Sequence, residues 1–208
     1  VVDYDAFKKV VDETVAQSGR LDYLFNNAGI GVGGPVERVE LKHWHHILDV
    51  NIRGVVHGSH AAYPIMVEQG FGHIINTASM AGLMPSPGMV PYGATKYAVV
   101  GLSHSWRIEA AMKGVRVSAL CPGAIRTPIL MTGGKFGTLR LDIPKEKMEA
   151  TWEQVKPMEP AKFARQVLRR VAKNKATIIV PTWWRVIWWI NRFCPPLGRW
   201  VASQSHRQ

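Results

Sequence analysis

The sequence has few cysteines, no long apolar run and no clear metal-ligand pattern. Cys121 and Cys194 are the two cysteines in 208 residues, and they suit neither a disulfide framework nor a zinc site, so a reducing compartment is expected. No apolar run approaches the ~20 residues that span a bilayer, and no signal peptide is visible. His45 and His46 would face different ways on a helix, so no metal is expected there. These absences predict a cytoplasmic protein that is at most peripheral to a membrane surface.

Acidic residues are also absent after Glu159. The net charge is +11, and ten Lys and Arg residues follow that position, so most of the excess positive charge lies in the last quarter of the chain. This asymmetry predicts an anionic partner, such as a membrane surface, a nucleic acid or an acidic protein. Nucleic acid is not expected, because no known binding motif is present and the tryptophans are not regularly spaced for base stacking.

The rest of the sequence has an ordinary globular composition, with 47% apolar residues and 19 glycines. The length is sufficient for one α/β domain with a sizeable core. Short apolar runs are typical of buried parallel strands, and segments of helical periodicity separate them. The sequence predicts strands at 21–25, 72–78, 115–120 and 177–180, and helices at 4–18, 36–69 with a bend near Asn51, 90–113, 145–150 and 160–173.

Three polar side chains are predicted to meet above this sheet. Ser79 ends the strand 72–78, while Tyr92 and Lys96 lie four residues apart at the start of a helix and so share one face. A nearby ammonium favours the phenolate, and lowering the pKa of Tyr92 by ~3 units requires about 4 kcal/mol. Such a group suits general acid–base chemistry on a carbonyl or an alcohol. The alternative is a half-buried Tyr beside a solvated Lys, since many helices carry this pair.

Four motifs together favour the catalytic interpretation. Asn26-Asn27-Ala28-Gly29 follows the first predicted strand, Asn51 lies in Asp49-Val50-Asn51-Ile52, Ser79 precedes Tyr92 by thirteen residues, and Pro122-Gly123-Ala124-Ile125-Arg126-Thr127 follows the strand 115–120. In this order and at this spacing, residues 3 to about 180 resemble the short-chain dehydrogenase/reductase family. The resemblance implies a Rossmann-like, doubly wound parallel sheet.

The resemblance also implies a cofactor, NAD or NADP, and a catalytic set made of Asn51, Ser79, Tyr92 and Lys96. Tyr92 would donate or accept the hydroxyl proton, and Lys96 would lower its pKa and hold the nicotinamide ribose. Ser79 would orient the substrate oxygen, and Asn51 would support the proton relay. A homodimer or homotetramer is implied, with helices 52–69 and 90–113 pairing across a two-fold axis. The residues implied to line the cofactor are Asn27, Ala28, Gly29, Tyr92, Lys96, Pro122, Gly123, Ile125 and Thr127.

The family's first βαβαβ portion is not present in the sequence. That portion holds the glycine-rich turn that places the pyrophosphate at a helix N-terminus. Gly29-x-Gly31-x-Gly33-Gly34 does not replace it, because Pro35 follows where a helix should open, and we interpret the segment as a flexible loop. The sequence therefore predicts an incomplete Rossmann-like catalytic domain at 1–181, whose strand 21–25 is a bare apolar edge.

A Trp-rich basic extension is predicted at 182–208. Four of the eight tryptophans fall within 183–189, and Arg185 and Arg192 would share one face of a helix. Tryptophan favours the headgroup level of a bilayer, and cations favour anionic lipid, so one interpretation is an interfacial membrane anchor. The other interpretation is a helix that packs on the domain or on a dimer partner.

The sequence as a whole predicts an NAD(P)-dependent oxidoreductase that interconverts a secondary alcohol and a ketone, or an alcohol and an aldehyde. The apolar loop Leu83-Met84-Pro85 and the Trp-rich tail favour a lipophilic small-molecule substrate. The alternative hypothesis is a catalytically inactive scaffold derived from the same family, which docks on membranes through its tail.

Overall fold

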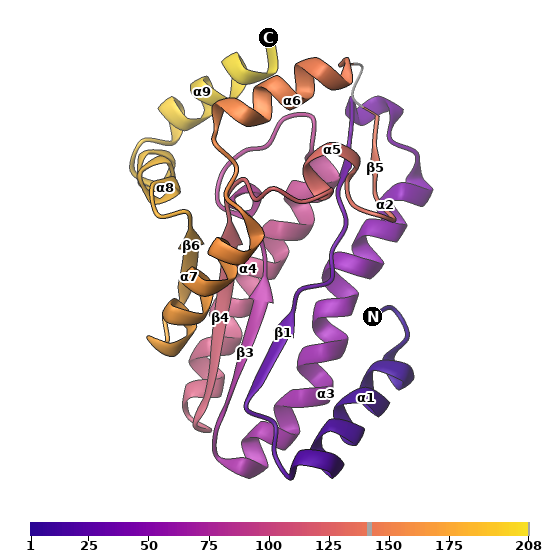
Figure 1. Cartoon of the computed structure of the whole chain (residues 1–208), viewed down its shortest axis with the longest axis vertical. Helices are drawn as coiled ribbons and strands as arrows, with labels where there is room; N and C mark the ends of the chain where they lie inside the picture. Colours follow the sequence, from indigo (N-terminus) through magenta and orange to yellow (C-terminus); the bar gives the residue numbers. More distant parts are fainter. Residues whose placement is uncertain (141–142, 208) are drawn as a thin grey trace.

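The computed structural model describes residues 1–140 and 143–207, and a four-stranded parallel sheet lies at its centre (Figure 1). The predicted α/β fold is confirmed, and each predicted strand lies within two residues of the observed one. β1 forms one edge of the sheet, and its Tyr23 and Phe25 side chains are exposed. The strand order is β1 (Tyr23–Asn26), β3 (Gly72–Thr77), β4 (Val115–Pro122) and β6 (Thr177–Val180).

Helices cover both faces of the sheet, because successive side chains of a strand point to opposite faces. Ile74 of β3 packs in a cluster with Met66, whereas its neighbour Ile75 packs in another cluster with Val167 and Val171. The sheet is therefore doubly wound, as predicted. The first face is covered by α1 (Tyr4–Ser18), α3 (Gly54–Gln69) and α4 (Val90–Ala111), and the second by α7 (Pro160–Ala172).

The position of the predicted bend near Asn51 coincides with a π-helical turn. The helix α2 (Leu41–Leu48) runs into a π-helical turn, Asp49–Arg53, which continues directly into α3. A π-helical turn inserts one residue into the helical repeat, and such turns are frequent at functional sites. Here the turn directs the Asn51 side chain into the interior, where it is fully buried.

The prediction of a flexible loop at Gly29 to Gly34 is wrong. Val32–Gly33 forms β2, which pairs in parallel with β5 (Thr138–Leu139). The Gly31 amide donates to the Gly133 carbonyl at 2.7 Å, and a Cβ on Gly33 would overlap Met89. The glycines in this segment allow close backbone packing, which the local sequence pattern does not reveal.

The remaining helices lie near the carboxyl ends of the strands, at the top of Figure 1. Within the part of the chain that the structure describes, no helix combines the length and the apolar character needed to cross a membrane. α8 packs through Trp184 and Trp188 against a buried cluster that includes Ala78 and Cys121. These helices are α5 (Ile129–Thr132), α6 (Lys145–Gln154), α8 (Trp184–Phe193) and α9 (Pro195–Arg207).

Candidate active site

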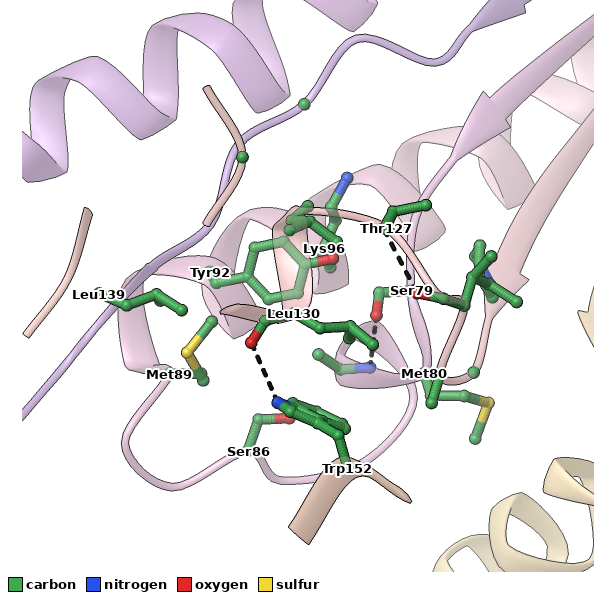
Figure 2. Close-up of a pocket in the computed structure, with 18 of the residues that line it drawn as sticks. Ser79, Met80, Ser86, Met89, Tyr92, Lys96, Thr127, Leu130, Leu139 and Trp152 are labelled. Atoms are coloured by element: carbon green, nitrogen blue, oxygen red, sulfur yellow. Dashed lines mark hydrogen bonds between the residues drawn. The ribbon is translucent and has the colours of Figure 1, made fainter. Parts of the chain in front are cut away.

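Ser79, Tyr92 and Lys96 meet at the carboxyl end of β3, on the wall of an open cleft of about 1990 Å³ (Figure 2). Ser79 begins a short 3₁₀ turn, and its Oγ accepts a hydrogen bond from the Ala81 amide at 3.1 Å. Tyr92 and Lys96 occupy the first two turns of α4, and the Lys96 Nζ lies 5.5 Å from the centroid of the Tyr92 ring. The structure therefore brings together the three groups that sequence spacing predicted to converge.

Lys96 is buried, with only 3% of its surface exposed. Its Nζ donates to the Thr77 carbonyl, the last residue of β3, at 2.8 Å. Burial disfavours the charged form and lowers the pKa of Lys96 to about 8. The ammonium has two further N–H donors for a ligand in the cleft.

The prediction that the Tyr92 pKa is lowered is wrong for this structure. Burial raises the pKa of Tyr92, and a hydrogen bond with Ser79 opposes this effect without cancelling it. The cost of burying a phenolate exceeds the stabilisation that its neighbours provide. Tyr92 is therefore held as a neutral phenol, which is the form that donates a proton to a substrate oxygen.

Asn51 supports the site from behind the cleft wall. Its Oδ1 accepts from the Ile30 amide at 2.8 Å, and its Nδ2 donates to the Ile30 carbonyl at 2.9 Å and to the Thr95 Oγ1 at 3.1 Å. Through these bonds Asn51 joins Ile30 to Thr95 of α4, which is the residue before Lys96. Asn51 thus acts on this geometry as a positioning residue, and its part in a proton relay stays a prediction.

The segment after β1 forms one side of the predicted cofactor wall. A Cβ on Gly29 would lie 3.3 Å from the Asn51 Oδ1 and 3.4 Å from the Lys96 Nζ, so a larger side chain would fill the space beside the ammonium. The Asn27 Oδ1 accepts from the Thr77 Oγ1 at 3.0 Å. Asn27 and Gly29 line the cleft, whereas Ala28 is exposed and is not among the lining residues.

The segment after β4 forms the other side of the predicted cofactor wall. Gly123 donates its amide to the Val180 carbonyl at 2.9 Å, and the Thr127 Oγ1 donates to the Ile125 carbonyl at 3.3 Å. Pro122, Gly123, Ile125 and Thr127 all line the cleft, and their contact with a cofactor stays a prediction. Segments that follow β1 and β4 therefore line the same cleft as the buried Lys96.

Trp184, which the sequence pattern does not single out as a site residue, lines the same cleft. A Cβ on Gly123 would overlap the Trp184 indole, so the ring lies directly against this glycine. The indole N–H is buried and, within the described part of the chain, has no hydrogen-bond acceptor. No local signal distinguishes Trp184 from its neighbours, because only the packing of α8 decides which indole faces inward.

Two other residues support the site without a local sequence signal. Thr77 supplies the carbonyl that holds Lys96, which sequence cannot specify because any residue has a carbonyl. Asn26, beside the predicted cofactor wall, donates through Nδ2 to the Asn76 Oδ1 at 2.8 Å and to the Ser59 Oγ at 2.9 Å. This buried network joins β1, β3 and α3 below the site and explains why the first residue of Asn26-Asn27 is polar.

Replacing Gly123 with Ala is expected to destabilise the protein by about 1–3 kcal/mol, because the new methyl group must displace the Trp184 indole. Urea denaturation followed by circular dichroism measures this change. Gly101→Ala on α4 is the matched control, since a Cβ there meets nothing within 4 Å and should be neutral or stabilising. Equal stability of Gly123→Ala and wild type would contradict the observed position of α8.

The outer part of the cleft is mainly apolar. Met84, Met89, Leu130 and Leu139 line it, and the Trp152 indole of α6 donates to the Leu130 carbonyl at 3.0 Å across its mouth (Figure 2). No group of three or more His, Cys, Asp or Glu in residues 1–140 and 143–207 is arranged to hold a metal ion. The arrangement combines a polar acid–base end with an apolar outer chamber.

Comparison with known proteins agrees with this geometry. A sequence model of the short chain dehydrogenase family matches residues 1–136. A 3-oxoacyl-[acyl-carrier-protein] reductase of Thermotoga maritima is 37% identical over 129 residues, which cover 62% of this chain and 52% of the relative. An 11-beta-hydroxysteroid dehydrogenase A of Sesamum indicum is 31% identical over 198 residues, which cover 93% of this chain and 55% of the relative. The chain thus spans about half the length of these curated relatives.

A solved structure extends the likeness to the fold. A short chain dehydrogenase/reductase from Burkholderia phymatum, in complex with NAD, superimposes with a TM-score of 0.78 at 26% identity. The match covers 94% of this chain and 74% of that structure.

Proposed function

The chain belongs to the short-chain dehydrogenase family, and we propose that the protein interconverts an alcohol and a ketone or aldehyde with NAD or NADP. The observation that carries this proposal is the convergence of Ser79, Tyr92 and Lys96 at the carboxyl end of β3. Ligands of open α/β sheets bind at this end of the strands. NAD(P), when bound, supplies or receives the hydride.

The chain's own residues bind the oxygen and move the proton. The Ser79 hydroxyl holds the reacting oxygen, and the Tyr92 phenol donates its proton to that oxygen during reduction or receives it during oxidation. Lys96 is fixed by the Thr77 carbonyl and lies beside Gly29, and its remaining N–H donors would hold a ribose hydroxyl of the cofactor there. The cofactor would also contact residues that line the cleft, namely Asn27, Gly29, Pro122, Gly123, Ile125 and Thr127.

The substrate is proposed to be lipophilic. The outer chamber is lined by Met84, Met89, Leu130 and Leu139, which can bury an apolar body while Ser79 holds its single polar group. Two of the relatives are named for reactions on a 3-oxoacyl group and on a steroid, which supports a substrate of this class.

Self-association through α3 and α4 is also proposed. Tyr97 and Ile108 of α4 are 47% and 73% exposed, and large apolar side chains on a helix surface favour a partner of the same kind.

Cofactor titration tests the function. NADH or NADPH, added to the full-length gene product, is expected to quench tryptophan fluorescence saturably, because Trp184 lies on the cofactor wall. The preferred nucleotide then identifies the cofactor. If neither nucleotide binds, the second hypothesis, a scaffold without catalysis, is favoured. The exposed apolar surface of the C-terminal helices supports that hypothesis.

A further inference from the structure

α8 is apolar on two opposite faces. Trp184 and Trp188 face inward and pack on the core. Large apolar side chains also point away from the core on α8 and α9, where they are 40–76% exposed, and we call this surface the outer face of α8–α9. It comprises Val186, Trp189, Ile190, Phe193, Leu197 and Trp200. Exposed apolar side chains on the second side of such a helix favour a partner there.

Arginine side chains border this face, and the surrounding stretch of sequence contains no Asp or Glu. Arg185 and Arg192 are exposed and lie seven residues apart, two helical turns, along one flank of α8. Arg199 of α9 is exposed as well, and no acidic residue follows Glu159 in the sequence. The partner should therefore present an apolar layer next to negative charge.

We propose that the outer face of α8–α9 docks the protein on a membrane surface that contains anionic lipid. Exposed indoles such as Trp189 and Trp200 favour the headgroup level, and a short amphipathic helix buries its apolar side at that depth. A second copy of the chain fits less well, because the same arginines would face one another across the contact.

The helix that carries the docking face also reaches the rim of the cleft, through its inner side. The Asn191 Nδ2 of α8 donates to the Leu83 carbonyl at 3.0 Å, and the next residues, Met84 and Pro85, line the cleft. Trp184 lines it from the inner side of the same helix. Docking thus holds the cleft, which adjoins α8 on its inner side, close to the bilayer that supplies a lipophilic substrate; this route, though not the docking itself, rests on the proposed function.

Flotation with vesicles tests the docking. The 208-residue chain is expected to float at low salt with phosphatidylcholine vesicles that contain phosphatidylglycerol, and to float less at high salt, because salt screens the arginines. Phe193→Glu should weaken binding at least ~10-fold, because the side chain with the greatest exposure on the face becomes charged. Arg185→Gln with Arg192→Gln should weaken it about 30-fold, or about fivefold for each arginine.

The matched control is Val10→Glu, which makes the same kind of change at a 61% exposed position of α1, far from α8 in Figure 1. It should float as wild type does. Tyr92→Phe should also float as wild type does, so that a failure of the proposed catalysis is distinguished from a failure of docking. The proposal is overturned if the wild type does not float, if Phe193→Glu floats equally well, or if Phe193→Glu abolishes self-association instead of flotation.

Discussion

Replacing Tyr92 with Phe is expected to lower kcat by about 10²–10⁴-fold and to leave the affinity for the nicotinamide cofactor close to that of wild type. The substitution removes only the phenolic oxygen, which holds the proton and contacts Ser79. The ring itself remains packed at the start of α4, so the cofactor wall keeps its shape. Steady-state turnover of a ketone, measured beside cofactor titration, separates these two effects.

The control for this prediction is Tyr97→Phe on the same helix. Tyr97 is 47% exposed and does not line the cleft, so the loss of its hydroxyl should change neither turnover nor cofactor affinity. Unchanged turnover in Tyr92→Phe would remove Tyr92 from the acid–base role, and with it the proposed reaction.

Replacing Lys96 with Met is expected to abolish turnover and also to change how stability depends on pH. The pKa of Lys96 is about 8 in the folded protein, against an ordinary value of 10.5. Between these two values the unfolded chain binds more protons than the folded protein, so the free energy of unfolding of wild type rises with pH. The variant lacks this contribution. Between pH 7 and pH 10 the free energy of unfolding of wild type should therefore rise by about 2–3 kcal/mol relative to that of the variant.

Urea denaturation of both proteins at several pH values measures the difference. Below pH 7 Lys96 is protonated in both states, so the difference should be constant there. Lys162→Met, at an exposed position of α7, is the control and should show no such dependence. A constant difference across the whole range for Lys96→Met would mean that the ammonium is not buried as described.

Most of the fold could be predicted because its signals are local. The strands are short apolar runs that are buried on both faces, and α1 is marked at its ends by Asp3, which accepts the Ala6 amide, and by Gly19 at a positive φ. The convergence of Ser79, Tyr92 and Lys96 also follows from local geometry, since a strand end and one helical turn define it. Their chemical states do not follow, because the pKa of Tyr92 depends on how much of the surrounding protein excludes water.

The sequence by itself determined the parallel sheet, an irregularity in the helix near Asn51, and the residue types of an acid–base site. Only the tertiary structure decided that Val32 and Gly33 form an ordered strand, that Trp184 lies against Gly123, and that the outer side of α8 stays uncovered. The reason is physical: periodicity and capping act over one or two helical turns. The close backbone packing at Gly33, the inward position of Trp184 and the raised pKa of Tyr92 have another origin. They depend on segments that are distant in sequence and that only folding brings into contact.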